Sequence, residues 1–136
     1  MNINSILSKK EVPEINTLSP LTLAFLGDSV YEMFVRTKIL SLGNRPANEL
    51  HKIAVGYVKA KAQAEAAHKI MDLLTEDELV IYKRGRNTNI HTVPKNADMA
   101  DYRHATALEA LIGYLYLKGD DGRLREILNI AFDSLT

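Results

Sequence analysis

LAFLGDSVYEMFV, residues 23–35, is an apolar helical segment that a glycine and an aspartate interrupt. The preceding Ser19-Pro20 is typical of a helix N-cap followed by proline at the first helical position. Apolar residues then recur at helical spacing, so we expect a helix over about residues 20–40. Gly27 and Asp28 are both poor helix formers, glycine by up to about 1 kcal/mol relative to alanine. Close approach of another backbone or a ligand would explain them, and a solvent-facing aspartate is the alternative.

A second apolar run, ALEALIGYLYL at residues 107–117, contains Glu109 as its only charge. An isolated buried charge is very costly, so this carboxylate must be solvated in a cleft, paired or bound to a cation. The alternatives are an ion pair with Arg103 or Lys118, and a narrow exposed stripe shared with Tyr102 and Tyr116.

The middle of the chain predicts three more helices. Two are expected between Pro46 and Leu74, the second of them rich in alanine. Thr75 opens the third, because with Glu78 it forms a T-x-x-E capping box, and Gly85 is its expected end.

The last third of the chain predicts a long loop and two helices. Residues 86–98 have no periodicity, and loops of that length in compact domains are often functional. A helix is expected over 99–117, ended by Gly119, and an amphipathic helix over 124–135. Because no segment shows the sequence pattern of a strand, we expect an all-α fold.

Composition indicates one globular domain in a reducing compartment. The chain has 136 residues, of which 46% are apolar and 25% charged. It contains no cysteine, which excludes a disulfide framework and a thiolate metal site. No apolar run approaches the roughly 18 to 20 residues of a spanning helix, and the first residues do not resemble a signal peptide. We therefore expect a cytoplasmic protein with no membrane partner.

The formal net charge is zero, but the charges are unevenly distributed. Residues 36–69 hold seven lysines or arginines against two acids, and residues 83–104 hold five against two. Acids exceed bases in residues 105–136. Such polarity could direct a basic face toward phosphates, and a solvated surface of uneven charge is the alternative.

Asp28 and Glu109 each lie near a glycine, Gly27 and Gly113, that could allow two helices to pack closely. The two carboxylates could then face one another across a groove. That arrangement suits Mg²⁺, which takes oxygen ligands and commonly uses one or two protein carboxylates together with water and a substrate phosphate. The four histidines show no zinc-site spacing, and no nucleophile-elbow motif supports a serine triad.

Two segments carry a family resemblance. FLGDSVYE at residues 25–32 resembles the signature of the ribonuclease III family, and residues 107–117 resemble the second catalytic segment of that family, in the same order. The resemblance extends from about Leu18, so we expect an N-terminal extension over 1–17 and a catalytic domain with the ribonuclease III endonuclease fold over 18–136. We expect no double-stranded-RNA-binding domain after it, which is typical of the Mini-III branch.

The resemblance implies that Asp28 and Glu109 are the essential metal-site carboxylates, with Mg²⁺ as the cofactor and Mn²⁺ as a substitute. Ala24 and Thr106 stand where most of the family has two further carboxylates. Thr106 could instead orient a metal-bound water through its hydroxyl. For Glu32, one turn beyond Asp28, we expect a supporting or structural role.

The resemblance also implies a function. We expect a metal-dependent endoribonuclease that cuts double-stranded RNA, leaves 5′-phosphate ends and matures the ends of precursor 23S ribosomal RNA. Two strands require two sites, so a homodimer is expected, with Phe25 and Leu26 as interface candidates and monomer core as their alternative. A ribosomal protein could assist.

Contacts to RNA should rest on shape and phosphate charge, because the accessible groove of A-form RNA is shallow. The expected contact residues are Lys83, Arg84, Arg86, Lys95, Arg103, Lys59 and Lys61.

Two non-enzymatic readings compete. One is a catalytically weak RNA-binding factor for ribosome assembly on the same scaffold, which the residues at Ala24 and Thr106 favour and the presence of both Asp28 and Glu109 opposes. The other is a purely structural helical oligomer, which leaves Asp28 and Glu109 unexplained.

Overall fold

The computed structural model describes residues 8–9, 11–89, 95 and 98–135, and within them every regular element is a helix. The α-helices of this part of the chain are α2 (Pro20–Ile39), α3 (Ala47–Val58), α4 (Ala60–Ile70), α5 (Glu76–Asn87), α6 (Met99–Lys118) and α7 (Asp121–Asp133). Short 3₁₀ helices are η1 (Ile15–Thr17), η2 (Leu40–Leu42) and η3 (Met71–Leu73). The predicted all-α fold is confirmed. Among the described helices, none combines the length and apolar character needed to cross a membrane.

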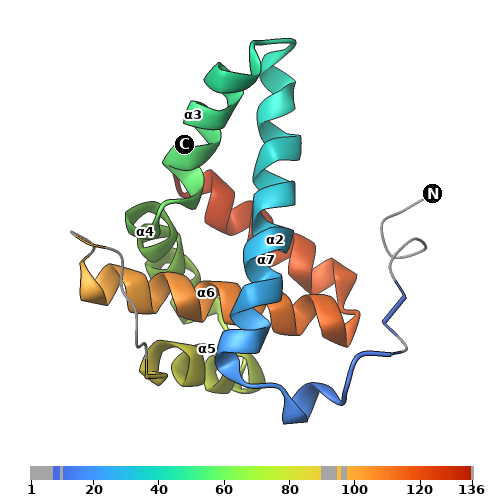
Figure 1. Cartoon of the computed structure of the whole chain (residues 1–136). Coiled ribbons are helices and arrows are strands. Elements are labelled where there is room, and N and C mark those ends of the chain that lie inside the picture. The colour runs from blue at the N-terminus through green and yellow to red at the C-terminus, as the bar shows by residue number, and fades with distance from the viewer. Residues whose placement is uncertain (1–7, 10, 90–94, 96–97, 136) are drawn as a thin grey trace.

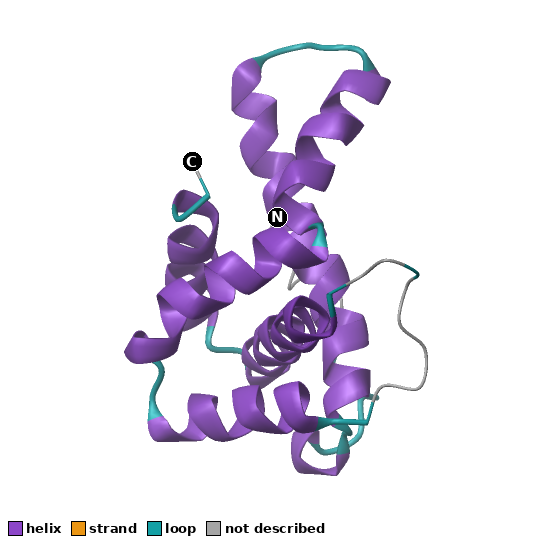
Figure 2. Ribbon diagram, turned by 90° about the vertical axis from the view of Figure 1, so that its left-hand side faces the viewer, coloured by secondary structure: helices purple, strands orange, loops and turns teal. Residues whose placement is uncertain are grey.

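Helix α6 forms the centre of the molecule. It buries most of its residues between Ala105 and Tyr116, a segment that covers all but the last residue of the apolar run recognised in the sequence. α2 packs on it most extensively, followed by α5 and α4. Figure 1 shows α2 crossing α6, with α4 and α5 on opposite sides of it, and Figure 2 looks roughly along α6 with the other helices around it.

Capping side chains fix the helix ends as predicted. The backbone N–H of Thr22 donates to Ser19 Oγ at 3.2 Å, which caps α2. At the start of α5, Glu78 N donates to Thr75 Oγ1 and Thr75 N donates to Glu78 Oε1, completing the capping box. Gly119 adopts the left-handed conformation, with φ of 80°, and ends α6.

The expectation that α5 ends at Gly85 is wrong, because the helix continues to Asn87. Gly85 is buried against α6, where an added Cβ would lie 3.0 Å from the Cα of Ala107. The glycine therefore serves close packing of α5 on α6 and does not end the helix. The following loop starts at Thr88, and its residues 90–94 and 96–97 lie outside the described part of the chain.

A buried ion pair ties α5 to α7. The Glu78 carboxylate accepts hydrogen bonds from Arg123 Nε and Nη2 at 2.8 and 2.7 Å. Arg123 also donates to the carbonyl oxygen of Leu73 at 2.7 Å and pairs with Glu126. The hydrogen bonds from Arg123 lower the pKa of Glu78, so this carboxylate stays ionised although it is buried.

Candidate active site

The crossing of α2 over α6 brings two backbones into direct contact. A Cβ on Gly27 would lie 1.7 Å from the carbonyl oxygen of Glu109, and one on Gly113 would lie 2.1 Å from the carbonyl oxygen of Leu23. Only glycine fits at either position unless the helices separate. The close backbone approach that the sequence suggested for Gly27 is therefore confirmed, and it places residue 28 beside residue 109.

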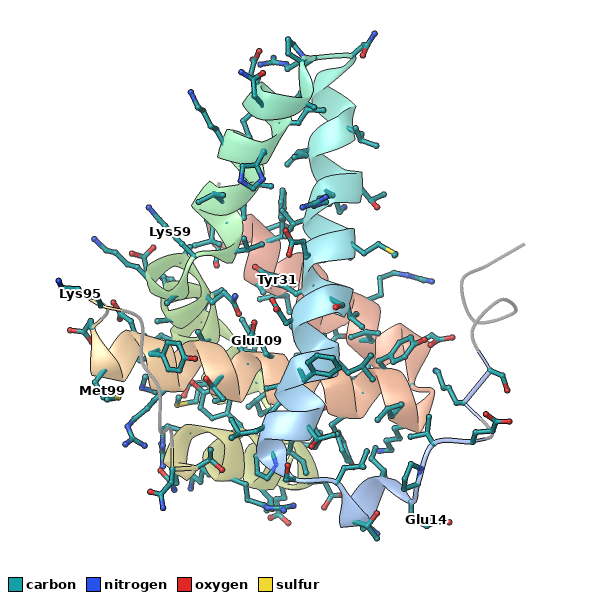
Figure 3. All side chains as sticks on the ribbon, in the orientation of Figure 1. Glu14, Tyr31, Lys59, Lys95, Met99 and Glu109 are labelled. Carbon is teal, nitrogen blue, oxygen red and sulfur yellow. The ribbon has the colours of Figure 1, made fainter. Side chains whose placement is uncertain are left out.

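Asp28 and Glu109 face one another at this crossing. Asp28 is exposed, whereas Glu109 is half-buried and in Figure 3 lies between α2 and α4. Burial raises the pKa of Glu109 to about 8, with further increases from hydrogen bonding to the Asp28 carboxyl and from repulsion by its charge. A hydrogen bond from Gln63 acts in the opposite direction. The site thus disfavours two negative charges and would be stabilised by a cation.

The alternatives for Glu109 find no support in the described residues. None of the ion pairs there includes Glu109. Arg103 instead donates to the carbonyl oxygens of Arg86 and Thr88. Tyr116 is buried, so it does not form an exposed stripe with Glu109.

Gln63 of α4 also reaches Glu109, although it was not among the predicted site residues. Its Nε2 donates to the carbonyl oxygen of Val58 at 2.7 Å and to Glu109 Oε2 at 3.4 Å. The side chain is only 3% exposed. One signal could have found it: Gln63 is a lone amide on the face of α4 that carries Ala66, Ala67 and Ile70, all of them buried.

The residues at the crossing fit a hard divalent cation held by few protein ligands. The two adjacent carboxyls supply oxygen donors, and no group of three or more histidine, cysteine, aspartate or glutamate side chains in the described residues could hold a metal. Water and substrate oxygens would complete an octahedral shell.

Three neighbouring positions shape the site without adding a carboxylate to it. Ala24 and Thr106 are both buried, and the Thr106 hydroxyl donates to the carbonyl oxygen of Tyr102 at 2.9 Å. That hydroxyl can still accept a hydrogen bond from water, and its predicted orienting role stays a prediction. Glu32 pairs with Arg36 at 3.0 Å on the surface of α2, which fits a structural role.

The predicted RNA contacts lie on both sides of α6. Lys59 and Lys61 are exposed at and after the joint between α3 and α4, while Lys83 and Arg84 are exposed on α5. Figure 1 places α4 and α5 on opposite sides of α6, so the two pairs do not form one cluster.

The remaining predicted contacts lie at the loop. Lys95 is exposed, and Figure 3 shows it on the same side of the molecule as Lys59. Arg86 and Arg103 are half-buried, and the guanidinium of Arg103 holds the start of the loop through the carbonyl oxygens of Arg86 and Thr88, at 3.2 and 3.3 Å. Arg103 is therefore engaged within the protein, whereas Lys95 is directed to solvent.

Phe25 is 81% exposed, three residues before Asp28 on α2. The alternative that Phe25 belongs to the monomer core is wrong. Leu26 is half-buried and packs against the core, so monomer packing accounts for much of its side chain.

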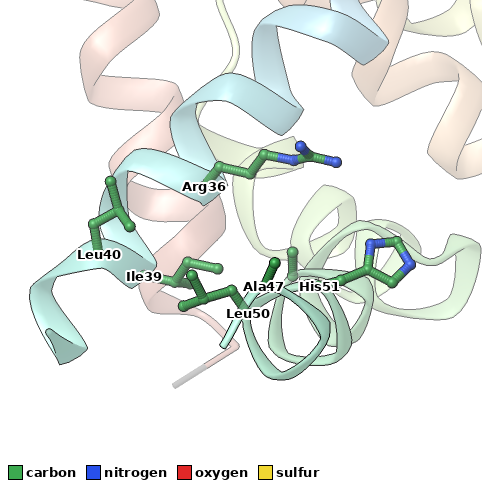
Figure 4. A pocket seen from close by; sticks show the side chains of 7 residues that line it. Arg36, Ile39, Leu40, Ala47, Leu50 and His51 are labelled. Atoms are coloured by element: carbon green, nitrogen blue, oxygen red, sulfur yellow. The ribbon is translucent and has the colours of Figure 1, made fainter. Parts of the chain in front are cut away.

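A cavity of about 240 Å³ lies between α2 and α3, away from the carboxylates. Figure 4 shows its lining residues, which are Arg36, Ile39, Leu40, Ala47, Leu50, His51 and Ala54. They contribute no carboxylate, and the two that belong to α2, Arg36 and Ile39, lie about two turns or more beyond Asp28. This cavity is therefore separate from the acidic pair at the α2–α6 crossing.

The chain is similar to known proteins both in sequence and in structure. The ribonuclease III domain family matches residues 21–120. The Mini-ribonuclease 3 of Thermoanaerobacter sp. (strain X514) is 54% identical over 115 residues, which cover 85% of this chain and 81% of that protein. The Mini-ribonuclease 3 of Brevibacillus brevis is 52% identical over 117 residues, covering 86% and 87%. A crystal structure of a Fusobacterium nucleatum protein has a TM-score of 0.81 at 37% identity, covering 90% of this chain and 98% of that one.

Proposed function

This chain belongs to the ribonuclease III family, in its Mini-III branch, and is an endoribonuclease, and we propose that it cuts double-stranded RNA at a magnesium site held by Asp28 and Glu109. The observation that carries the proposal is the meeting of these two carboxyls at the α2–α6 crossing, where the pKa of Glu109 is raised to about 8. Two acidic groups that repel one another in a half-buried site favour a divalent cation. Mn²⁺ is expected to substitute, because it accepts the same oxygen ligands.

A bound cation would supply positive charge against the scissile phosphate and lower the pKa of a coordinated water. The protein residues contribute position. Asp28 is exposed and can be approached by a phosphate. Glu109 belongs to α6, and its backbone carbonyl contacts α2 at Gly27. This rigid crossing fixes the separation of the two carboxyls.

We further propose that the enzyme is a homodimer whose two sites cut the two strands of one duplex. Phe25 supports this, because a large aromatic side chain exposed to water beside the active site gains much from burial against a second copy. A two-fold interface through α2 would also bring two copies of this helix together, each with its own Asp28.

The proposed substrate is precursor ribosomal RNA, specifically the ends of the large-subunit (23S) RNA, with a ribosomal protein as an assisting partner. Support comes from exposed basic side chains at the α3–α4 joint, on α5 and at Lys95, which suit the phosphates of an A-form duplex. Binding through so few phosphate contacts should weaken steeply with added salt.

The test is cleavage of a labelled RNA duplex with Mg²⁺ or with a chelator. Asp28→Asn and Glu109→Gln should each lower the rate on the order of a thousandfold, while Glu65→Gln, an exposed carboxylate on α4, serves as the matched control. Circular dichroism should show that all variants fold. Cleavage by either active-site variant near the wild-type rate would refute the metal assignment. A duplex that the wild type shifts in a gel but leaves intact would indicate an RNA-binding assembly factor instead.

A further inference from the structure

The orientation of the Gln63 amide is determined by its neighbour Val58. Val58 offers a carbonyl oxygen at 2.7 Å, which can only accept, so the NH₂ group must face it. The same nitrogen then lies 3.4 Å from Glu109 Oε2. The Oε1 atom then points the other way, where it is buried and has no hydrogen-bond partner among the described residues.

The amide spans the end of one helix and a side chain of another. α3 ends at Val58 and α4 begins at Ala60, with Lys59 extended between them, so the last carbonyl groups of α3 lack partners within the helix. Gln63 supplies one of these partners from the first turns of α4. With the same nitrogen it reaches Glu109 on α6.

A buried acceptor without a partner weakens folding, so a glutamine at this position is unfavourable for the core alone. Methionine has a similar length and would fill the space without an orphaned oxygen. The presence of an amide at this position therefore needs an explanation. Capping of the C-terminal end of α3 is one explanation. Holding Glu109 is the other, and only this one predicts an effect on the acidic site.

We infer that Gln63 is a positioning residue, whose amide orients the Glu109 carboxylate toward Asp28 by tying it to the end of α3. The inference rests on the proposed metal role of Asp28 and Glu109. Without the amide, Glu109 can rotate away from Asp28, and a cation would meet one oriented carboxylate where the wild type offers two. The chain thus uses a neutral side chain from α4 to set the geometry of an acidic pair on α2 and α6.

The test compares Gln63→Met with the wild type and with Ala67→Gly, which removes a buried methyl group from the same helix and leaves the amide in place. The first readout is Mn²⁺ affinity without RNA, measured by electron paramagnetic resonance. Gln63→Met should bind Mn²⁺ about tenfold more weakly, as expected for the loss of one hydrogen bond to a charged group. Ala67→Gly should melt earlier but bind Mn²⁺ as the wild type does.

Cleavage kinetics provide the second readout. In Gln63→Met the Mg²⁺ concentration for half-maximal rate should rise about tenfold, while the rate at saturating Mg²⁺ falls much less. If Gln63→Met and Ala67→Gly melt alike and bind Mn²⁺ alike, Gln63 only caps α3 and the inference is overturned.

A measurement on the wild-type side chain covers the case in which Gln63→Met does not fold. The ¹H–¹⁵N signals of the Gln63 side-chain amide should shift when Mg²⁺ is added, and should move in Glu109→Gln without metal. If these signals shift neither on addition of Mg²⁺ nor in Glu109→Gln, the inference is refuted. The proposed function fails separately, if Asp28→Asn and Glu109→Gln bind Mn²⁺ as tightly as the wild type.

Discussion

Of the two carboxyls at the α2–α6 crossing, Glu109 is less exposed to solvent than Asp28. Burial and the neighbouring Asp28 raise the pKa of Glu109 from 4.5 to about 8, although Gln63 opposes the shift. At neutral pH without a cation, Glu109 therefore holds a proton for much of the time. Binding of a divalent cation must displace that proton, so metal affinity and pH are coupled in this site.

The first expected outcome concerns stability against pH in metal-free protein. Because the folded-state pKa of Glu109 is raised, the folded chain binds more protons than the unfolded chain between about pH 4.5 and 8. The stability from this group is present below the lower value and lost as the pH rises through the upper one. Glu109→Gln should therefore be more stable than the wild type by about 1 to 3 kcal/mol near pH 8.5. Urea unfolding with a chelator measures this.

The same variant should show little difference from the wild type near pH 5, where Glu109 is already protonated. Adding Mg²⁺ near pH 8.5 should stabilise the wild type more than Glu109→Gln. A constant stability difference between the two proteins at both pH values would contradict the raised pKa.

The sequence predicted the acidic pair because both residues conflict with their surroundings. Asp28 follows a glycine inside a helix, and Glu109 is the lone charge in an apolar run. Gln63 could not be predicted in the same way, since glutamine is a good helix former and fits either face of an alanine-rich helix. Its partner Glu109 is 46 residues away and becomes a neighbour only when α4 and α6 pack together.

At the scale of elements, the contact between α2 and α6 depends on two glycines. We expect Gly27→Ala to lower the free energy of unfolding by about 3 kcal/mol or more, because its Cβ would lie 1.7 Å from the carbonyl oxygen of Glu109. Gly56→Ala is the matched control: Gly56 lies in α3 with open space around it, and alanine there should stabilise the helix by up to about 1 kcal/mol.

Thermal or urea unfolding distinguishes the two glycine variants. Gly27→Ala should also lose cleavage activity, because separating the helices moves Asp28 away from Glu109. If Gly27→Ala were as stable as Gly56→Ala, the helices could not be in the close contact described.

A second expected outcome for the elements concerns the pair that joins α5 to α7. Arg123→Met leaves the buried Glu78 carboxylate without its main partner and should cost about 3 kcal/mol in unfolding free energy. Arg45→Met, which removes an exposed pair with Glu49, should change stability by no more than about 0.5 kcal/mol. Chemical unfolding at neutral pH measures both.

Unfolding measured at low pH tests the Glu78–Arg123 ion pair between α5 and α7. The pKa of Glu78 is lowered in the folded state, so its contribution is present above its ordinary value and lost as the pH falls below it. The stability difference between the wild type and Arg123→Met should therefore shrink in acid. Equal losses for Arg123→Met and Arg45→Met would show that the buried pair contributes no more than an exposed one.

The helix pattern was largely predictable from local signals. The last helix begins at Asp121, three residues before the expected start, and the misplaced end of α5 has a non-local cause. Three helix ends are set by contacts between residues close in the sequence, so their sequence patterns identify them. These are the N-cap at Ser19, the capping box at Thr75 and the left-handed Gly119. Gly85 looks like the same kind of signal. Its function is to admit the backbone of α6, and nothing near it in the sequence reveals that neighbour.

At the scale of the whole molecule, the described chain buries its core around α6 and leaves a large aromatic side chain in water. Exposed lysines and arginines lie on α4, on α5 and at Lys95, on both sides of α6. Phe25 lies near the acidic site on α2. RNA would meet the basic residues, and the apolar ring is left for contact with protein.

The last expected outcome tests assembly through that ring. Phe25→Asp places a charge where the proposed dimer buries an aromatic side chain, so the variant should sediment as a monomer while the wild type sediments as a dimer. Val80→Asp, at an exposed apolar position on α5, should leave the dimer intact. A monomer has one site, so Phe25→Asp should nick single strands of a duplex where the wild type cuts both. A wild type that sediments as a monomer and still cuts both strands of the duplex would refute the proposed dimer.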